Sequence, residues 1–447
     1  MKLRSILPAV AVAALLAAPA VRAADALSPV CVAHAAASLD ALAHGDYAGA
    51  RKDFGEAIAG KLDAARLEQV WKQLQGELGA YQSHDAVRQK TLAGHAVAAA
   101  TLSFANMQLG FAAACDAQDK ITTYRFVPAE ALAATAVQAH VEADGIRVSP
   151  LDVPTPVGPL RGALTLPPGT GPFPAVVLVA GSGAHDMDET IGPNKPFRDI
   201  AEGLARAGIA SLRYDKRTFD HPESGAGLVI DAEVTDDAVA AAHLLAQQKG
   251  IDARRVFVLG HSLGAMMAPR IGQRDPQLAG LVLMAAPARQ IFDVIEQQVR
   301  EQQARSGRPP AAIEQAVQAN VQERKLLAAI APGQSAPQGK FGGMPQAYWL
   351  SWSRVDPVAE AERLPSMPML ILQGGSDFQI SPTLDFARWQ QELSSRPHTA
   401  FRLYPGLSHL FMPAGKTGTA ADYEIPAHVD AQVIGGIAAW VKAQPSR

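Results

Sequence analysis

The amino-acid sequence predicts an α/β fold, in which a mostly parallel sheet carries a helical cap insertion and follows a small α+β domain. The chain has 447 residues, more than one ordinary core contains, so we expect two domains. From residue 145 to the end, short apolar segments alternate with helical ones, as in a buried parallel sheet. Residues 286–366 interrupt this alternation, although a crossover needs only about a dozen residues.

Composition indicates a folded globular protein. Hydrophobic residues make up 48% of the chain and charged residues 19%, and the formal net charge is −3. The sequence contains no basic stripe, so we expect neither nucleic acid nor an acidic membrane surface as a partner.

The first 23 residues predict a targeting signal. Lys2 and Arg4 give it a positive start, and residues 6–20 form an apolar run. Val21-Arg22-Ala23 then places small residues where a signal peptidase cleaves. The alternative is a membrane anchor, but a run of about 15 residues is shorter than the ~20 that span a bilayer. We therefore expect a cleaved signal peptide, no stable membrane anchor, and a periplasmic or secreted protein.

Residues 27–127 predict the small α+β domain, with helices on one face of a curved sheet. Apolar residues recur at helical spacing over residues 39–74. The pattern then changes to strand-like segments separated by turn residues. The expected strands are residues 86–92, 95–104, 108–115 and 120–127, with tight turns at Gly94 and Asn106, and a linker follows at residues 128–144.

Cys31 and Cys115 are the only cysteines. In an oxidising compartment they can form a single disulfide, and the long loop that it closes would contribute roughly 4 kcal/mol through chain entropy. The alternative is two buried free thiols. We favour the disulfide.

The larger domain, residues 145–447, contains the predicted parallel sheet. Within its cap, residues 286–366, apolar residues at helical spacing predict two helices, Ile291–Val299 and Ile313–Val321, with a break at Gly307–Pro310. We expect the cap over the carboxyl edge of the sheet, where such folds bind ligands. The expected strands are residues 175–180, 210–214, 256–259, 281–285, 369–373 and 401–404, and the expected helices include 197–207 and 233–248.

The pentapeptide Gly260–Gly264, Gly-His-Ser-Leu-Gly, is the strongest functional motif. It follows the apolar strand Val256–Leu259 and precedes a plausible helix start. A nucleophile elbow needs this context, because the serine occupies a strained strand-to-helix turn and its neighbours two positions away must be very small. The motif predicts Ser262 as a nucleophile. The alternative is a surface serine in a glycine-rich loop.

A serine nucleophile needs a histidine base. His409 follows the last expected strand in a loop, and we predict that it is this base. His428 lies farther along, before the C-terminal helix, and ranks second. His261 is adjacent to the serine but points away from a turn of this kind, so we expect it to be structural.

Asp377 follows the expected strand 369–373 and is the predicted acid that orients the histidine. The order Ser, Asp, His is that of hydrolases with a nucleophile elbow and differs from the orders in chymotrypsin and subtilisin. Asp385 is a competitor, but it falls within an expected helix, where we expect an exposed surface charge.

When a serine attacks a carbonyl carbon, the carbonyl oxygen becomes a negatively charged oxyanion. Two backbone N–H groups should stabilise this oxyanion. The N–H of Leu263 directly follows the nucleophile, and that of Ser182 lies in the glycine-rich turn Gly181–Gly183 after an early strand. The alternative for this turn is a phosphate-binding loop, but the lysine spacing of such a loop is missing.

From about residue 145 to the end, the chain resembles the exported α/β-hydrolase family that groups small esterases with serine-peptidase-like members of the S33 and S9 types. The resemblance implies ester hydrolysis by a serine esterase with a catalytic triad, without a cofactor. The sequence departs from the family pattern at Met187, where family members often carry arginine. The segments that carry this resemblance are Gly181–Gly183 with Asp186–Glu189, Asn194–Asp199, Arg213–Arg217, the nucleophile elbow, and the loops that contain Asp377 and His409.

The small domain is similar to the cystatin-like or NTF2-like domains found ahead of secreted hydrolases. The similarity lies in Gly45–Tyr47, in Leu67–Trp71 followed by Gly79, and in the strand run that ends at Lys120-Ile121.

Several alternatives remain open at this level. Asp186 and Asp188 could bind a metal, although a polar loop network is favoured and no metal is expected. Tyr348, Trp349 and Trp352 could line an acyl pocket or pack in the core.

The reaction also has alternatives. A peptidase or amidase could use the same triad, with Glu360 or Glu362 binding an α-ammonium group, and a non-catalytic ligand-binding protein could share the fold. We expect a small-molecule ester as the substrate.

Overall fold

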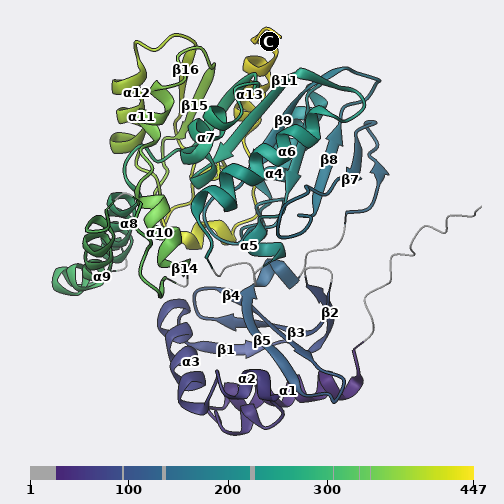
Figure 1. Ribbon diagram of the computed structural model, residues 1–447, viewed down its shortest axis with the longest axis vertical. Coiled ribbons are helices and arrows are strands. Elements are labelled where there is room, and N and C mark those ends of the chain that lie inside the picture. The colour runs from purple at the N-terminus through teal and green to yellow at the C-terminus, as the bar shows by residue number, and fades with distance from the viewer. Residues whose placement is uncertain are drawn as a thin grey trace, which may run out of the picture. The chain divides into compact units, whose positions relative to one another are not determined.

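The computed structural model describes residues 27–92, 95–132, 137–221, 227–305, 307–331, 333–342 and 344–446. The expected signal peptide, the Gly94 turn and part of the expected linker lie outside these residues. The described residues form a five-stranded antiparallel sheet, a nine-stranded, mostly parallel sheet and a two-stranded antiparallel sheet. Figure 1 labels most of their strands.

The N-terminal part combines helices with an antiparallel sheet of strand order β1-β3-β4-β5, with β2 paired to β3. Strands β3 and β4 have the bounds that the sequence predicts. Strand β1 was missed, because Tyr-Gln-Ser-His has no apolar alternation. The elements are α1 (Pro29–Ala43), α2 (Glu56–Ala59), α3 (Ala64–Leu78), β1 (Tyr81–His84), β2 (Arg88–Leu92), β3 (His95–Phe104), β4 (Gln108–Cys115) and β5 (Ile121–Pro128).

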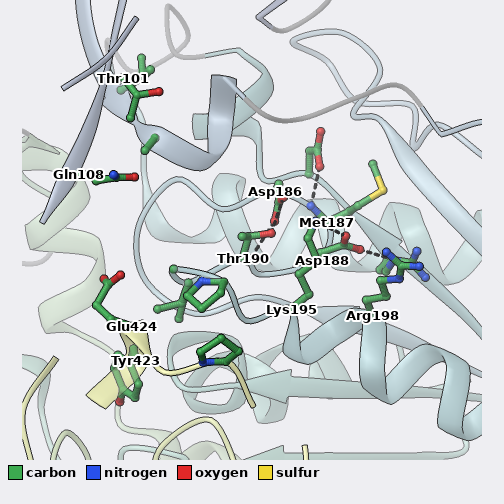
Figure 2. A pocket seen from close by; sticks show the side chains of 18 of the residues that line it. Thr101, Gln108, Asp186, Met187, Asp188, Thr190, Lys195, Arg198, Tyr423 and Glu424 are labelled. Atoms are coloured by element: carbon green, nitrogen blue, oxygen red, sulfur yellow. Dashed lines mark hydrogen bonds and ion pairs between the residues drawn. The ribbon is translucent and has the colours of Figure 1, made fainter. Parts of the chain in front are cut away.

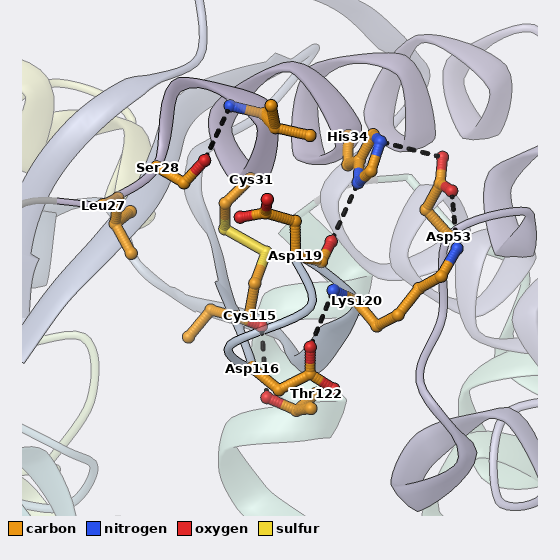
Figure 3. Close-up of a disulfide and its surroundings, with 12 residues drawn as sticks. Leu27, Ser28, Cys31, His34, Asp53, Cys115, Asp116, Asp119, Lys120 and Thr122 are labelled. Carbon is orange, nitrogen blue, oxygen red and sulfur yellow. Dashed lines mark hydrogen bonds and ion pairs between the residues drawn. A yellow bond between two sulfur atoms is a disulfide. The ribbon is translucent and has the colours of Figure 1, made fainter.

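A disulfide joins Cys31 of α1 to Cys115 at the end of β4 (Figure 3). Polar contacts surround it: His34 Nδ1 lies 2.8 Å from the Asp119 carbonyl oxygen, and Lys120 Nζ lies 3.0 Å from Asp53 Oδ1. The structure therefore ties the first helix to the sheet at the turn between β4 and β5.

The larger sheet has the strand order β16-β15-β12-β11-β9-β10-β8-β7-β6 among the described residues. The pairs from β16 through β10 are parallel, whereas β8, β7 and β6 are added antiparallel at one edge. The strands are β6 (His140–Val141), β7 (Arg147–Pro150), β8 (Gly162–Leu166), β9 (Phe173–Val179), β10 (Ala210–Tyr214), β11 (Ile251–His261), β12 (Gly280–Met284), β15 (Met369–Gly374) and β16 (Thr399–Tyr404).

The three antiparallel edge strands were not predicted. Strand β7, Arg-Val-Ser-Pro, and strand β8, Gly-Ala-Leu-Thr-Leu, are short and carry few β-branched residues. The sheet begins at His140, within the segment expected to be a linker. Short strands of mixed composition depend on pairing with a neighbour, which the local sequence does not show.

Alternate residues of the parallel strands face two separate cores. Val177, Val258 and Leu283 lie in one core, and Leu178, Phe257 and Val282 lie in the other. Helices α6 (Asp237–Ala246), α7 (Leu263–Arg274) and α12 (Ala387–Leu393) contribute to the first core, and α4 (Pro196–Arg206) and α13 (Ala431–Ala443) contribute to the second. Both faces are covered, which explains the continuous apolar runs of these strands.

Between β12 and β15 the chain forms the expected helical insertion. Helices α8 (Ile291–Arg305) and α9 (Pro310–Ala328) match the two predicted helices. They contact each other, and α10 (Gln346–Ser353) contacts both. The insertion also contains β13 (Lys340–Phe341), β14 (Met344–Pro345) and α11 (Pro357–Glu362); elsewhere the chain forms the short helix α5 (Arg217–Asp220).

The cap aromatics are core residues. Trp349 and Trp352 stack with their ring centroids 5.4 Å apart, and Tyr348 packs edge-on against both. All three are buried in the core that contains α7, and Trp352 Nε1 donates to the sulfur of Met266. The structure therefore favours core packing over an acyl pocket for these side chains.

In the described part of the chain, no helix combines the length and the apolar character needed to cross a membrane.

Candidate active site

Ser262 occupies the strained turn that the elbow motif predicts. It lies between the end of β11 and the start of α7, with φ of 51° and ψ of −112°. A Cβ on Gly260 would lie 2.2 Å from the Gly264 carbonyl carbon, and one on Gly264 would lie 2.2 Å from the Val179 oxygen. Both positions accept only glycine, because backbone atoms occupy the space of a side chain.

His409 and Asp377 are hydrogen-bonded in the structure. The distance between His409 Nδ1 and Asp377 Oδ2 is 2.8 Å, and both side chains are buried. Asp377 Oδ1 also accepts hydrogen bonds from the backbone N–H groups of Gln379 and Ile380, at 2.8 and 2.9 Å. The acid is therefore fixed by its own loop and can hold the imidazole in one orientation.

Gln373 is a site residue that the sequence did not reveal. Its Nε2 donates to Asp377 Oδ2 at 2.8 Å. A buried glutamine in the apolar strand β15 is the signal that could have found it, because a buried polar side chain needs a partner.

Ser262 and His409 line the same cavity, which has a volume of about 340 Å³. Three of the predicted site residues thus meet at one place: the nucleophile, the base and Ser182. Among the other lining residues are Gly181, Gly183, His185, Asp186, Glu189, Thr190, Ile191, Phe219, His261, Gln379 and Tyr423.

The two predicted oxyanion donors come from adjacent segments. Leu263 is the first residue of α7, and such N–H groups have no acceptor within the helix. Ser182 lies just after β9 in the turn that begins at Gly181, where an added Cβ would lie 3.2 Å from the Cβ of Ser262. The glycine-rich turn therefore brings the Gly181–Ser182 peptide beside the nucleophile.

His261 bridges two loops of the site. Its Nδ1 lies 2.9 Å from Glu189 Oε1, and its Nε2 lies 3.0 Å from the carbonyl oxygen of His409. Both partners are acceptors, so only the doubly protonated imidazolium can donate to both. The structural role predicted for His261 is thus that of a buried cation that holds the loop containing His409.

The His261–Glu189 pair shifts the pKa values of both members. Burial is the largest single cause and lowers the pKa of His261. The charge and hydrogen bond of Glu189, the His409 carbonyl and the charge of Asp377 together raise it by more, so the net shift is upward. Burial raises the pKa of Glu189, whereas the charge and hydrogen bond of His261 lower it, and the net shift is downward. No sequence signal beyond the resemblance indicated Glu189.

The competing triad residues lie elsewhere. The His428 side chain is 87% exposed and pairs with Asp199. Asp385 was expected to be an exposed surface charge, and this expectation is wrong. Its side chain is fully buried, where it accepts from the Ala288 N–H at 2.9 Å and pairs with Arg289. Both partners lie in the segment that follows β12, far from Asp385 in the sequence, so the local sequence did not show that Asp385 is buried.

Asp188 belongs to a polar loop network (Figure 2). It pairs with Arg213 at 2.8 Å and with Lys195 at 3.0 Å. Burial raises the pKa of Asp188, but the two cations together lower it by more, so the net shift is downward. The carboxylate is therefore ionised at neutral pH.

Asp186 accepts from the N–H and the hydroxyl of Thr190 at 2.9 and 2.7 Å. Across the described residues, no three His, Cys, Asp or Glu side chains gather in a metal-binding arrangement. Met187, the departure from the resemblance, is buried and donates its backbone N–H to Asp215.

The cap acids do not reach the cavity. Glu360 is buried and pairs with Arg270, and Glu362 is exposed. Neither lines the cavity that contains Ser262.

Two families match the sequence. The family described as serine aminopeptidase, S33, matches residues 184–413. A second family, described as a protein of unknown function (DUF3887), matches residues 35–123. The chain is also similar to Esterase EstD of Thermotoga maritima, with 34% identity over 385 residues that cover 86% of this chain and 89% of the relative.

Solved structures are similar at a lower level. The esterase domain of a Rhodothermus marinus protein has 19% identity and a TM-score of 0.40, over 66% of this chain and 98% of that one. A Pyrococcus furiosus esterase has 14% identity and a TM-score of 0.43, over 66% and 91%. The S33 family match and the similarity to Esterase EstD carry the assignment. The chain belongs to the α/β-hydrolase family of serine hydrolases, in the group described as serine aminopeptidase, S33.

Proposed function

We propose that the protein is a serine esterase that cleaves carboxylic esters through an acyl-enzyme on Ser262. The observation that carries this proposal is the site geometry. Ser262 stands on its strained turn in the same cavity as His409, and His409 is hydrogen-bonded to the buried Asp377. The similarity to an esterase over most of the chain supports ester rather than amide substrates.

In the first half of the reaction, His409 Nε2 removes the hydroxyl proton of Ser262 as the serine oxygen attacks the ester carbonyl carbon. The carbonyl oxygen becomes an oxyanion, which the N–H groups of Leu263 and Ser182 stabilise. Asp377 stabilises the imidazolium that forms. When the tetrahedral intermediate collapses, the bond to the alcohol oxygen breaks and that oxygen takes the proton from His409.

In the second half, water attacks the acyl carbon of the ester on Ser262, and His409 takes a proton from that water. Collapse of the second intermediate breaks the bond to the serine oxygen, which recovers its proton. The products are a carboxylic acid and an alcohol, and no redox partner or cofactor is consumed.

The cavity favours short acyl groups. Its volume of about 340 Å³ lies at the small end of ligand pockets, which span roughly 300–1,000 Å³. We therefore expect p-nitrophenyl acetate and butyrate to be better substrates than longer-chain esters.

A serine peptidase or amidase is the second candidate, because the matched family is described as serine aminopeptidase. An aminopeptidase needs an acid that is free to bind an α-ammonium group. Asp186 lines the cavity, but Thr190 donates to both of its oxygens, and Glu189 is paired with His261. Comparing p-nitrophenyl esters with aminoacyl p-nitroanilides separates the two candidates, and turnover of the anilides alone would reject the esterase.

The test of the proposed function is Ser262→Ala. We expect this variant to lose turnover of p-nitrophenyl acetate while it keeps the circular dichroism spectrum and melting temperature of the wild type. Ser408→Ala is the matched control, because Ser408 is also buried and precedes the base. Wild-type turnover in Ser262→Ala would reject the assignment.

We also propose that the protein is exported to the periplasm or secreted. Support comes from the apolar segment with a positive start at residues 1–23 and from the disulfide, which persists in oxidising compartments. Fractionation of the native host with sequencing of the mature N-terminus tests this, and a cytoplasmic protein that starts at Met1 would contradict it.

A further inference from the structure

Two buried side chains of opposite charge hold Gly181. Its N–H donates to Glu189 Oε1 at 2.6 Å, and its carbonyl oxygen accepts from Lys216 Nζ at 2.8 Å. Gly181 itself is buried beside Ser262. The turn after β9 is thus fixed on both sides of one residue by a carboxylate and an ammonium group.

Lys216 is only 4% exposed. Besides the Gly181 carbonyl, its Nζ contacts Glu233 Oε1 at 3.3 Å. Glu233 is itself held by the hydroxyls of Thr218 and Tyr348, at 2.7 and 2.6 Å. Burying a lysine costs free energy that an ion pair only offsets, so stability alone does not explain its position.

The position of Lys216 has a chemical consequence for the next residue. The Gly181 carbonyl and the Ser182 N–H belong to the same peptide unit. A cation that donates to the carbonyl polarises this unit and makes its N–H a stronger hydrogen-bond donor, because linked hydrogen bonds strengthen one another. The Ser182 N–H is the donor that the proposed mechanism uses for the oxyanion.

We propose that Lys216 is the positioning residue of the oxyanion hole and acts through the Gly181–Ser182 peptide. The inference rests on the proposed function, since it concerns the same reaction. Lys216 fixes the direction of the Ser182 N–H and increases its strength as a donor. Negative charge on the substrate oxygen develops only towards the transition state, so Lys216 contributes to kcat far more than to KM.

The experiment compares Lys216→Met with Lys216→Arg in the full-length protein. Loss of a direct oxyanion donor costs about 10²–10³ in kcat, and an indirect role should cost less. For Lys216→Met we expect kcat for p-nitrophenyl acetate to fall by roughly 10–100-fold, with KM within about twofold of the wild type. Lys216→Arg keeps the charge and should recover part of the loss.

A second readout uses a boronic acid, which forms a tetrahedral adduct with an active-site serine and resembles the transition state. We expect the affinity of Lys216→Met for phenylboronic acid to fall by about the same factor as kcat. A residue that merely supports the fold would not produce this parallel loss.

Arg213→Met is the matched control. Arg213 is also a buried cation, on β10 three residues earlier, and its partner Asp188 retains Lys195. Its removal should lower the melting temperature but leave kcat within a few-fold of the wild type. If Lys216→Met does not fold, Lys216→Gln replaces it. The neutral amide can still donate to the Gly181 oxygen, and kcat should then fall by at least a few-fold.

Unchanged kcat and boronate affinity in a folded Lys216 variant would overturn the inference. So would an equal loss of kcat in Arg213→Met, because the effect would then be one of stability. The rate of labelling by a fluorophosphonate separates this failure from failure of the proposed function. A wild type whose Ser262 is not labelled overturns both, whereas equal labelling of the wild type and Lys216→Met overturns the inference alone.

Discussion

Asp377 receives four hydrogen bonds through its two carboxylate oxygens. Oδ1 accepts from the backbone of residues 379 and 380, and Oδ2 accepts from Gln373 and faces His409. Because the first two donors are backbone groups, the oxygen of an asparagine at this position would remain with them. Its NH₂ group would then face His409 Nδ1.

This geometry predicts the effect of Asp377→Asn. The NH₂ group would hold the imidazole in the tautomer with its proton on Nε2, which cannot accept the proton of Ser262. We expect kcat for p-nitrophenyl acetate to fall about 10³–10⁴-fold, as measured by steady-state kinetics. Asp385→Asn is the control, since Asp385 is buried but binds Ala288 and Arg289 instead. A loss below tenfold in Asp377→Asn would reject its role.

The buried His261–Glu189 pair predicts a pH-dependent stability. The pKa of His261 is raised from 6.5, so its contribution is fully present below that value and is lost as pH rises through the folded pKa. The pKa of Glu189 is lowered from 4.5, so its contribution is present above that value and is lost as pH falls. The pair therefore stabilises the fold most in mildly acidic to neutral solution.

We expect the difference in melting temperature between the wild type and His261→Gln to be largest below pH 6.5 and to shrink as pH rises through the raised pKa of His261. Thermal unfolding at several pH values measures this. A difference that grows as pH rises would show that His261 is not a cation in the folded protein.

At the scale of elements, most of the parallel strands could be predicted from the sequence. Strand β10 has the predicted bounds, and β9, β12 and β15 agree within two residues. These strands are buried on both faces, so each reads as a continuous apolar run. Strands β1 and β7 were missed, because their stability comes from pairing with strands that the local sequence does not identify.

The elbow predicts a sharp dependence on glycine. Gly264→Ala would bring a Cβ within 2.2 Å of the Val179 oxygen, and a backbone atom cannot move aside. We expect the variant to lose roughly 3 kcal/mol or more of the free energy of unfolding. Chemical denaturation measures this loss.

Gly435→Ala provides the matched control in helix α13. Among the described residues, no atom outside the nearby backbone of its own helix lies within 4 Å of its added Cβ. Alanine should therefore stabilise the helix by about 0.5–1 kcal/mol. If Gly264→Ala were as stable as Gly435→Ala, the close approach of α7 to β9 would be wrong.

At the scale of the whole molecule, the candidate catalytic residues could be predicted from the sequence, whereas the contacts that support them could not. Ser262, Asp377 and His409 follow strands, and their spacing in the chain could be read directly. Glu189 and Lys216 contact Gly181 through the folded chain only. No local pattern shows that a buried charge will meet a particular peptide, so these two residues could not be predicted.

The disulfide predicts a local loss of stability in the N-terminal part. Cys31 and Cys115 are 84 residues apart, and chain entropy assigns such a cross-link roughly 4–5 kcal/mol. In a Cys31→Ser/Cys115→Ser variant we expect hydrogen exchange in α1 and β4 to become about 10³-fold faster. Exchange in β11 and β15 of the other sheet is the control and should not change. Equal protection of α1 in both proteins would contradict the prediction.

The central claim is that Ser262 is activated by His409 at the carboxyl edge of the parallel sheet. The most direct measurement is mass spectrometry of the folded protein after reaction with a fluorophosphonate. We predict one adduct, on Ser262, that forms much more slowly in His409→Gln and not at all after unfolding. An active esterase that carries its adduct on another residue, or that remains unlabelled at Ser262, would contradict the claim.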